Sequence, residues 1–210
     1  MDNKTAGKGK GFGAGRGGGI IPFFAPAMPT RPTLFLDRDG VLNERTPGDY
    51  VKHPDAFVPT QGVFEALARL GRLFGRIVVV TNQAGVGRGL MTEAQLLAVH
   101  QKMLDLTAAA GGRIDRVYYC PHRSDAGCNC RKPAPGMALQ AQADFPDIDF
   151  RQAWMVGDSA SDIEFGRRLG MQTVLITGKE EESELLAGMA IDLRFDALLA
   201  FARYWEQYSR

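Results

Sequence analysis

The chain has 210 residues, of which 45% are hydrophobic and 23% are charged, and its formal net charge is +1. This length allows one sizeable domain with its own core, and the near-neutral charge argues against a nucleic-acid partner. No apolar run approaches the roughly 18 residues that span a bilayer, and residues 1–16 lack the apolar centre of a secretory signal, so we expect no membrane partner.

The N-terminal segment differs from the rest of the chain. Residues 1–32 are rich in glycine, proline and basic residues, and we expect a flexible tail there. From Thr33 onward, short apolar runs alternate with amphipathic stretches. We therefore expect one domain over residues 33–210.

The alternating pattern predicts an α/β fold. Short runs rich in β-branched and aromatic residues predict buried strands at 33–37, 76–82, 116–120, 153–158 and 173–177. The stretches around them predict helices at 63–74, 92–110, 136–143, 161–169 and 196–208. Apolar strands that alternate with helices form a parallel sheet with helices on both faces.

Polar and reactive residue types follow four of the predicted strands. They are Asp37 and Asp39, then Thr81, Asn82 and Gln83, then Cys120 and His122, and finally Gly157 and Asp158. Ligands of such sheets bind outside the carboxyl ends of the strands. We therefore expect these residues to form one site at that edge of the sheet.

Carboxylates dominate two of these strand ends. Asp37 and Asp39 lie two residues apart, and Asp158 ends another predicted strand. Carboxylates held this close repel one another unless a cation lies beside them. Oxygen ligands of this kind suit a hard divalent ion, so the sequence predicts a Mg²⁺ site.

All three cysteines lie in one short loop. Cys120, His122, Cys128 and Cys130 offer four soft ligands, which suit a closed tetrahedral Zn²⁺ site. A disulfide between Cys128 and Cys130 is the weaker alternative, because it leaves Cys120 without a role. We expect zinc to fix the two residues that follow, Arg131 and Lys132. Free cysteines also favour a cytoplasmic, reducing location.

The motifs "DRDGVLN", "VVVTN", "RKPAPG" and "GDSASD" occur in this order. Together they resemble the four motifs of the haloacid dehalogenase (HAD) superfamily of phosphohydrolases, over roughly residues 33–179. The resemblance implies a Rossmann-like parallel sheet. It also implies a phosphomonoester hydrolase that works through an aspartyl-phosphate and requires Mg²⁺.

The resemblance also implies roles for single residues. Asp37 matches the nucleophile, and Asp39 matches the general acid and base, which we expect to be protonated when attack begins. Thr81 matches the hydroxyl that binds the transferring phosphoryl group, and Lys132 matches the lysine that neutralises it.

The remaining matches concern the last motif. Asp158 matches a Mg²⁺ ligand, beside the carboxylate of Asp37 and the backbone carbonyl of Asp39, and Asp162 matches a supporting acid.

The cysteine loop narrows the resemblance to a zinc-containing branch. That branch holds phosphatases of D-glycero-D-manno-heptose 1,7-bisphosphate and of histidinol phosphate. "TNQAGVGRG" and "CRKPAPGM" favour the heptose group, which removes the 7-phosphate during nucleotide-activated heptose biosynthesis for lipopolysaccharide or surface glycans. Ser159 departs from the pattern of that group, in which a lysine often follows the aspartate that Asp158 matches. Histidinol-phosphate phosphatase is the first alternative, polynucleotide 3′-phosphatase the second, and a zinc-stabilised binding module the non-enzyme alternative.

The spacing of the motifs leaves little room for a separate cap domain. We therefore expect an open site, bordered by loops, that accepts a small sugar phosphate. Candidate substrate-binding residues are Asn82, Gln83, Arg88 and Arg131, the arginines as partners for a second phosphate or for sugar hydroxyls. We expect a monomer.

Overall fold

The computed structural model describes residues 31–46, 48–177 and 183–208. Of the predicted N-terminal tail, residues 1–30 lie outside the described residues, so its flexibility remains a prediction. Among the described residues, no helix is long and apolar enough to cross a membrane.

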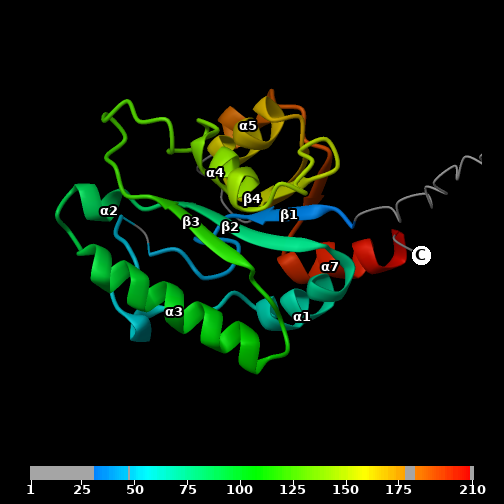
Figure 1. Ribbon diagram of the computed structural model, residues 1–210, viewed down its shortest axis with the longest axis horizontal. Helices are drawn as coiled ribbons and strands as arrows, with labels where there is room; N and C mark the ends of the chain where they lie inside the picture. The colour runs from blue at the N-terminus through cyan, green and yellow to red at the C-terminus, as the bar shows by residue number, and fades with distance from the viewer. Residues whose placement is uncertain (1–30, 47, 178–182, 209–210) are drawn as a thin grey trace, which may run out of the picture.

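A six-stranded, all-parallel sheet forms the centre of the molecule (Figure 1). The strands are β1 (Thr33–Leu36), β2 (Arg76–Asn82), β3 (Arg116–Cys120), β4 (Trp154–Gly157), β5 (Gln172–Ile176) and β6 (Leu193–Phe195). Their order across the sheet is β3-β2-β1-β4-β5-β6. The five predicted strands are confirmed, and β6 adds a short sixth.

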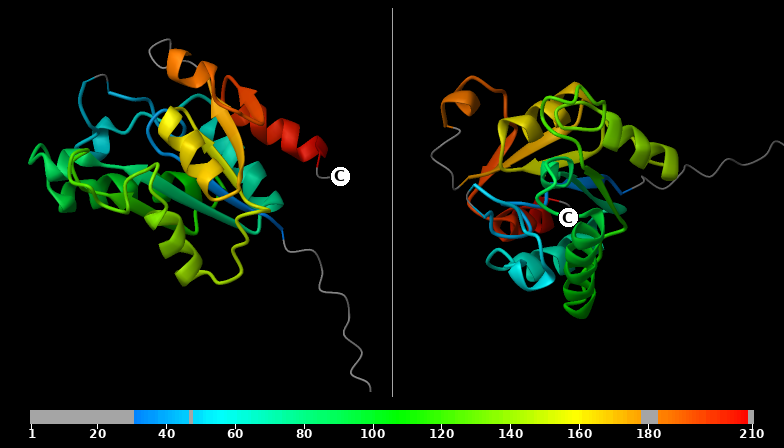
Figure 2. Two further views of the ribbon diagram at one scale, coloured as in Figure 1. Left: turned by 90° about the horizontal axis from the view of Figure 1, so that it is seen from above. Right: turned by 90° about the vertical axis from the view of Figure 1, so that its left-hand side faces the viewer.

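Helices cover both faces of the sheet, as the alternating sequence pattern predicts. The helices are η1 (Pro54–Ala56), α1 (Val63–Leu73), α2 (Ala84–Gly87), α3 (Glu93–Ala109), α4 (Gly136–Asp144), α5 (Ala160–Arg168), α6 (Ser183–Ala187) and α7 (Leu198–Tyr208). Figures 1 and 2 show α1, α3 and α7 on one face and α4 and α5 on the other. The Rossmann-like fold class is therefore confirmed.

The two faces of the central strands form two separate apolar cores. Leu34 and Leu36 of β1 pack in the core beneath α1, α3 and α7, whereas Phe35 between them packs in the core beneath α4 and α5. Val78 and Val79 of β2 divide between the cores in the same way. This alternation follows from the period of two in a β-strand.

The strand order determines where a site can form. β1 is flanked by β2 on one side and by β4 on the other, so the direction in which strands are added reverses between β1 and β4. The carboxyl ends of strands at such a reversal border a crevice. Among the described residues, only η1 and α1 lie between β1 and β2, so no cap domain covers this edge there.

Candidate active site

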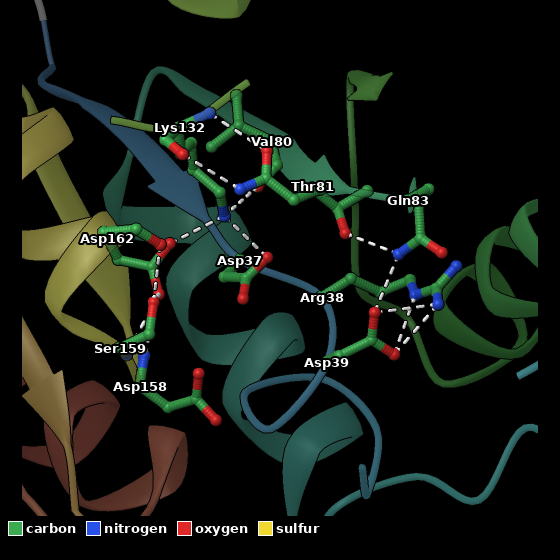
Figure 3. A network of polar contacts seen from close by, with 12 residues as sticks. Asp37, Arg38, Asp39, Val80, Thr81, Gln83, Lys132, Asp158, Ser159 and Asp162 are labelled. Carbon is green, nitrogen blue, oxygen red and sulfur yellow. Dashed lines mark hydrogen bonds and ion pairs between the residues drawn. The ribbon is translucent and has the colours of Figure 1, made fainter. Parts of the chain in front are cut away.

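Asp37 and Lys132 form the centre of the predicted site. Asp37 follows β1, and its backbone N–H donates to Val156 of β4 at 2.9 Å. The Lys132 ammonium donates to Asp37 Oδ1 at 2.7 Å and to the Val80 carbonyl at 2.6 Å (Figure 3). It also lies 2.7 Å from Asp162 Oδ1. The lysine of one motif thus joins the acids of two others.

Burial and neighbouring charges shift the pKa values of Asp37 and Lys132. Burial raises the pKa of Asp37 to about 7; Lys132 opposes the rise, and the neighbouring carboxylates of Asp162, Asp158 and Asp39 add to it. Burial acts against the charge of Lys132, but Asp162 and Asp37 outweigh it and raise the pKa of the ammonium. The ammonium is therefore a permanent positive charge beside the candidate nucleophile.

Asp162 organises the start of α5. Its Oδ2 accepts hydrogen bonds from the Ser159 hydroxyl at 2.6 Å and from the backbone N–H groups of Ser159 and Asp158, at 3.1 and 3.2 Å. Gly157 makes room for this contact, because a Cβ there would lie 2.1 Å from the Asp162 Cβ. Ser159 is thus buried as part of the helix start, and the Asp162 side chain holds that start in place.

The Asp158 carboxylate is almost fully buried and contacts the Arg45 guanidinium. Arg45 Nε also donates to the backbone carbonyl of Asp39 at 3.2 Å. These are two of the oxygens expected to bind Mg²⁺, and carboxylates of Asp37, Asp158 and Asp162 lie within 4.8 Å of one another. A cationic side chain already held by these oxygens indicates that they favour a cation.

Asp39 is held by three side chains. Arg38 Nη2 donates to both carboxylate oxygens at 2.9 and 2.8 Å, Asn43 Nδ2 donates to Oδ1 at 3.0 Å, and Gln83 Nε2 donates to Oδ2 at 2.7 Å. Burial alone would raise the pKa of Asp39, but the Arg38 charge and these hydrogen bonds lower it below its usual value. Without substrate, this arrangement favours the carboxylate, the form of a general base. That Asp39 is protonated when attack on the substrate begins stays a prediction.

Two predicted substrate-binding residues, Asn82 and Gln83, form hydrogen bonds with other residues of the site. Asn82 Nδ2 donates to the Lys132 carbonyl at 3.1 Å, and Asn82 Oδ1 accepts from the Lys132 N–H at 3.0 Å. Gln83 is fully buried, and its Nε2 also donates to the Thr81 hydroxyl at 2.8 Å. Both residues therefore hold other site residues in place, so the structure does not support direct contact between the buried Gln83 and a sugar.

The two arginines predicted to bind substrate differ in exposure. Arg88, the C-cap residue of α2, is exposed, whereas Arg131 is partly buried beside Lys132. Arg131 Nη1 is buried without a hydrogen-bond partner among the described residues. A buried donor of this kind favours an anionic ligand.

The cysteine loop brings its four predicted ligands together. Donor atoms of Cys120, His122, Cys128 and Cys130 all lie within 4.8 Å of one another, and the three sulfur atoms are 3.1–3.5 Å apart. The three cysteines are free, so the disulfide alternative is not what the structure forms. This cluster has the composition and closeness of a metal site.

The loop also packs against its surroundings. A Cβ on Gly87 of α2 would lie 2.7 Å from the Pro121 carbonyl oxygen, and one on Gly136 of α4 would lie 2.4 Å from that of Asn129. Glycine thus lets the loop approach both helices, and the loop ends at Arg131 and Lys132.

Comparison with known proteins agrees with this geometry. The profile of the HAD-hydrolase-like family matches residues 129–199. The chain is 42% identical to the D-glycero-beta-D-manno-heptose-1,7-bisphosphate 7-phosphatase of Pseudomonas putida, over 81% of this chain and 97% of that protein. This chain belongs to the heptose-bisphosphate phosphatase family of the HAD superfamily.

Other members of the family extend the comparison. The Mycobacterium tuberculosis relative, named for the alpha anomer of the same heptose bisphosphate, is 38% identical over 80% of this chain and 88% of that protein. A crystal structure of the D,D-heptose 1,7-bisphosphate phosphatase from B. bronchiseptica, complexed with magnesium and phosphate, superposes with a TM-score of 0.77. It shares 35% identity over 84% of this chain and 99% of that one.

Sequence reasoning missed three residues of this heptose-phosphatase site. Arg38 lies between the two motif aspartates, Arg45 comes from the loop after β1, and buried His100 comes from α3. The position of Arg38 inside "DRDG" was a signal. For Arg45 and His100 the sequence carries none, because their partners are distant in the chain.

Proposed function

We propose that this phosphatase removes the 7-phosphate of D-glycero-D-manno-heptose 1,7-bisphosphate, with Asp37 as the nucleophile. The observation that carries the proposal is the contact between Asp37 and Lys132 beside Asp158, at the strand ends of a chain about 40% identical to curated heptose-bisphosphate phosphatases. The heptose phosphate that results would serve nucleotide-activated heptose biosynthesis.

The chemistry follows from the charges. An Asp37 oxygen attacks phosphorus, the bond from phosphorus to the sugar oxygen breaks, and a proton passes from Asp39 to the departing oxygen. Water then attacks the aspartyl-phosphate, gives its proton to Asp39, and releases phosphate. Lys132 offsets the negative charge that gathers on the phosphoryl oxygens, and the Thr81 hydroxyl orients one of them.

Asp39 has to gain a proton before it can act as an acid. Its carboxylate accepts from Arg38, which favours the ionised form. The arrival of a doubly negative phosphate raises the pKa of a nearby carboxyl group. Asp39 thus starts as a carboxylate, takes up a proton as substrate binds, and returns to the base form after alcohol departure.

A divalent ion fits this cluster of carboxylates. Asp37, Asp158 and the Asp39 carbonyl would hold Mg²⁺, which supplies positive charge to the phosphoryl oxygens. Arg45 contacts two of these groups and has to move away from them when they bind a metal. Asp162 supports the site through Lys132 and α5.

The cysteine cluster fits a structural zinc ion. Three sulfur donors and one imidazole fill a tetrahedral shell and leave no open position for substrate. Zinc would crosslink the end of β3 to the residues directly before Lys132. The partly buried Arg131, with its unpartnered nitrogen, would bind the second phosphate or sugar hydroxyls, and Arg88 would reach the substrate from the rim.

A phosphate-release assay tests the proposed activity. The substrates are both anomers of the heptose bisphosphate, histidinol phosphate, and a 3′-phosphorylated oligonucleotide. We expect kcat/KM to be highest for a heptose bisphosphate, and comparison of the anomers shows which one is preferred. A higher kcat/KM for histidinol phosphate or for the oligonucleotide would overturn the proposed substrate. Size-exclusion chromatography tests the proposed monomer.

A further inference from the structure

Arg38 is the largest fully buried side chain among the described residues. It lies between Asp37 and Asp39 in the chain, and Figure 3 shows its guanidinium beside Asp39, apart from the group formed by Asp37 and Lys132. Burying an arginine is costly unless its charge is paired and its donors are bonded. A position that served packing alone would be filled at lower cost by an apolar residue.

The partner of Arg38 explains its orientation. Arg38 Nη2 donates to both oxygens of Asp39, and Nε donates to Oδ1 at 3.2 Å. The Arg38 side chain is 0% exposed, whereas the Asp39 side chain is 25% exposed. The guanidinium therefore supports the carboxylate from the protein side and leaves it open on the other.

His100 of α3 holds the far end of Arg38. The two side chains meet at 3.1 Å, between Arg38 Nη1 and His100 Nε2. Because a guanidinium has no acceptor, His100 Nε2 must accept this hydrogen bond, so its ring proton lies on Nδ1. Burial, followed by repulsion from Arg38, lowers the pKa of His100 to about 3, so the ring is neutral at physiological pH.

The rest of the Asp39 environment limits its motion further. Asn43 donates to one oxygen and Gln83 to the other. Each carboxylate oxygen thus has a fixed donor besides Arg38. Proton transfer needs the carboxyl group within hydrogen-bond reach of the sugar oxygen and then of the water, and a displacement of about 1 Å can cost on the order of 100-fold in rate.

We propose that Arg38, held by His100, is a positioning residue that fixes the Asp39 carboxyl group for its two proton transfers. This inference rests on the proposed phosphatase mechanism. Within the described part of the chain, the Arg38 side chain bonds to Asp39 and His100 and forms no hydrogen bond or ion pair with Asp37 or Lys132, so its effect passes through Asp39. A residue with this role affects the steps that transfer a proton and spares those that do not.

Substrates with different leaving groups separate these steps. An alkyl phosphate such as a sugar phosphate needs a proton from Asp39 when its oxygen departs. p-Nitrophenyl phosphate does not, because p-nitrophenolate is a stable anion. With either substrate, kcat/KM reports the steps up to departure of the leaving group, and hydrolysis of the aspartyl-phosphate needs Asp39 as a base in both cases.

The experiment compares Arg38→Met, His100→Phe and His100→Gln with the wild type. For Arg38→Met we expect kcat/KM to fall roughly 100-fold for the sugar phosphate and less than about threefold for p-nitrophenyl phosphate. Because the second step is also slowed, rapid mixing should show a burst of p-nitrophenolate. His100→Phe should show a smaller effect of the same kind, and His100→Gln, which keeps an acceptor, should restore wild-type behaviour.

Arg76→Met is a matched control. Arg76 is the first residue of β2, at the end of the strand away from Thr81 and Asn82, and it pairs with exposed Asp147. Equal losses of kcat/KM for both substrates in Arg38→Met and His100→Phe would show a structural role and overturn the proposal. If Arg38→Met fails to fold, the two His100 variants decide alone. If the heptose bisphosphate is not the substrate, the phosphate-release assay of the wild type shows it separately. Any alkyl phosphate that the wild type cleaves can then replace the sugar phosphate in this test.

Discussion

The aspartates of this site have different roles although they are the same residue type. Asp37 faces Lys132, Asp39 faces Arg38, and Asp162 faces both Lys132 and the start of α5. Burial raises the pKa of Asp37, whereas Arg38 and its hydrogen bonds lower that of Asp39. Environments that separate the pKa values of neighbouring acids are typical of catalytic sites.

The role of Asp37 can be tested by removing its charge. Asp37→Asn keeps the size of the side chain and an acceptor for Lys132, so we expect the fold to persist. Covalent attack is lost, and turnover should fall to background. Trapping of acid-stable phosphate on the wild type, but not on the variant, tests the intermediate. Activity within tenfold of the wild type would contradict a nucleophilic Asp37.

His100 predicts a specific dependence of stability on pH. Its pKa is about 3 in the folded protein against 6.5 ordinarily, so between these values the unfolded chain binds a proton that the folded chain does not. The wild type therefore loses stability as pH falls from about 6.5 toward 3, by up to about 1.4 kcal/mol per pH unit from this residue.

Urea unfolding of His100→Gln at pH 7, 5 and 4 measures that contribution. The variant should be less sensitive to acid than the wild type, because glutamine does not titrate. His53→Gln is the matched control, since His53 is exposed. Parallel pH curves for the wild type and His100→Gln would mean that His100 is not neutral and buried in solution.

At the scale of elements, long apolar runs were predictable and short or glycine-rich ones were not. The strands over 76–82 and 116–120 match their predicted ranges, because β-branched and aromatic residues fill them. β6 has three residues, none fully buried, and α2 is a single turn with the sequence "AGVG". Neither gives a periodic signal, since both depend on tertiary contacts.

The same reasoning separates the predictable part of the site from the rest. Asp37, Thr81 and Asp158 were predictable because parallel strand ends meet at one edge. The contact between Arg45 and Asp158 joins a loop to a distant strand end. The clamp of Asn82 on the Lys132 backbone likewise depends on how the cysteine loop returns to β2. Sequence spacing does not encode either contact.

The cysteine loop carries a prediction at this scale. Cys128→Ser removes one metal ligand and should release zinc, which elemental analysis measures. Because the loop then holds Lys132 less firmly, we expect kcat/KM to fall roughly 10-fold to 100-fold. The Asn82 clamp limits the loss, so Asn82→Ala combined with Cys128→Ser should lose more than the two single effects predict. A zinc-free Cys128→Ser with wild-type kcat/KM would refute the idea that the loop positions Lys132.

At the scale of the whole molecule, segments that are distant in the chain form the site, and the site lies outside the apolar cores. Two apolar cores cover the two faces of the central strands, whereas Asp37, Thr81, Lys132 and Asp158 lie at the edge of the sheet. Thr81 lies in β2, Asp37 and Asp158 directly follow β1 and β4, and the cysteine loop leads into Lys132. Metal binding should therefore change the edge of the sheet while the cores remain packed.

The charge of this edge predicts how Mg²⁺ binding depends on pH. In the metal-free protein the pKa of Asp37 is about 7, because burial and neighbouring carboxylates outweigh Lys132. A folded pKa above the ordinary 3.8 means that the metal-free protein loses stability as pH rises between these values. Mg²⁺ needs the carboxylate form, so below pH 7 its binding has to release a proton.

Calorimetric titration of the metal-free protein with Mg²⁺ measures this linkage. We expect Kd to increase about tenfold for each pH unit below 7 and to level off above it, with about one proton released per Mg²⁺ at pH 6. Buffers of different ionisation enthalpy count that proton. Asp37→Asn should bind more weakly and without this pH dependence. Arg45→Met should bind more tightly, because Arg45 contacts two of the same oxygens. Equal Kd values at pH 6 and pH 8 would show that Asp37 is already ionised at pH 6.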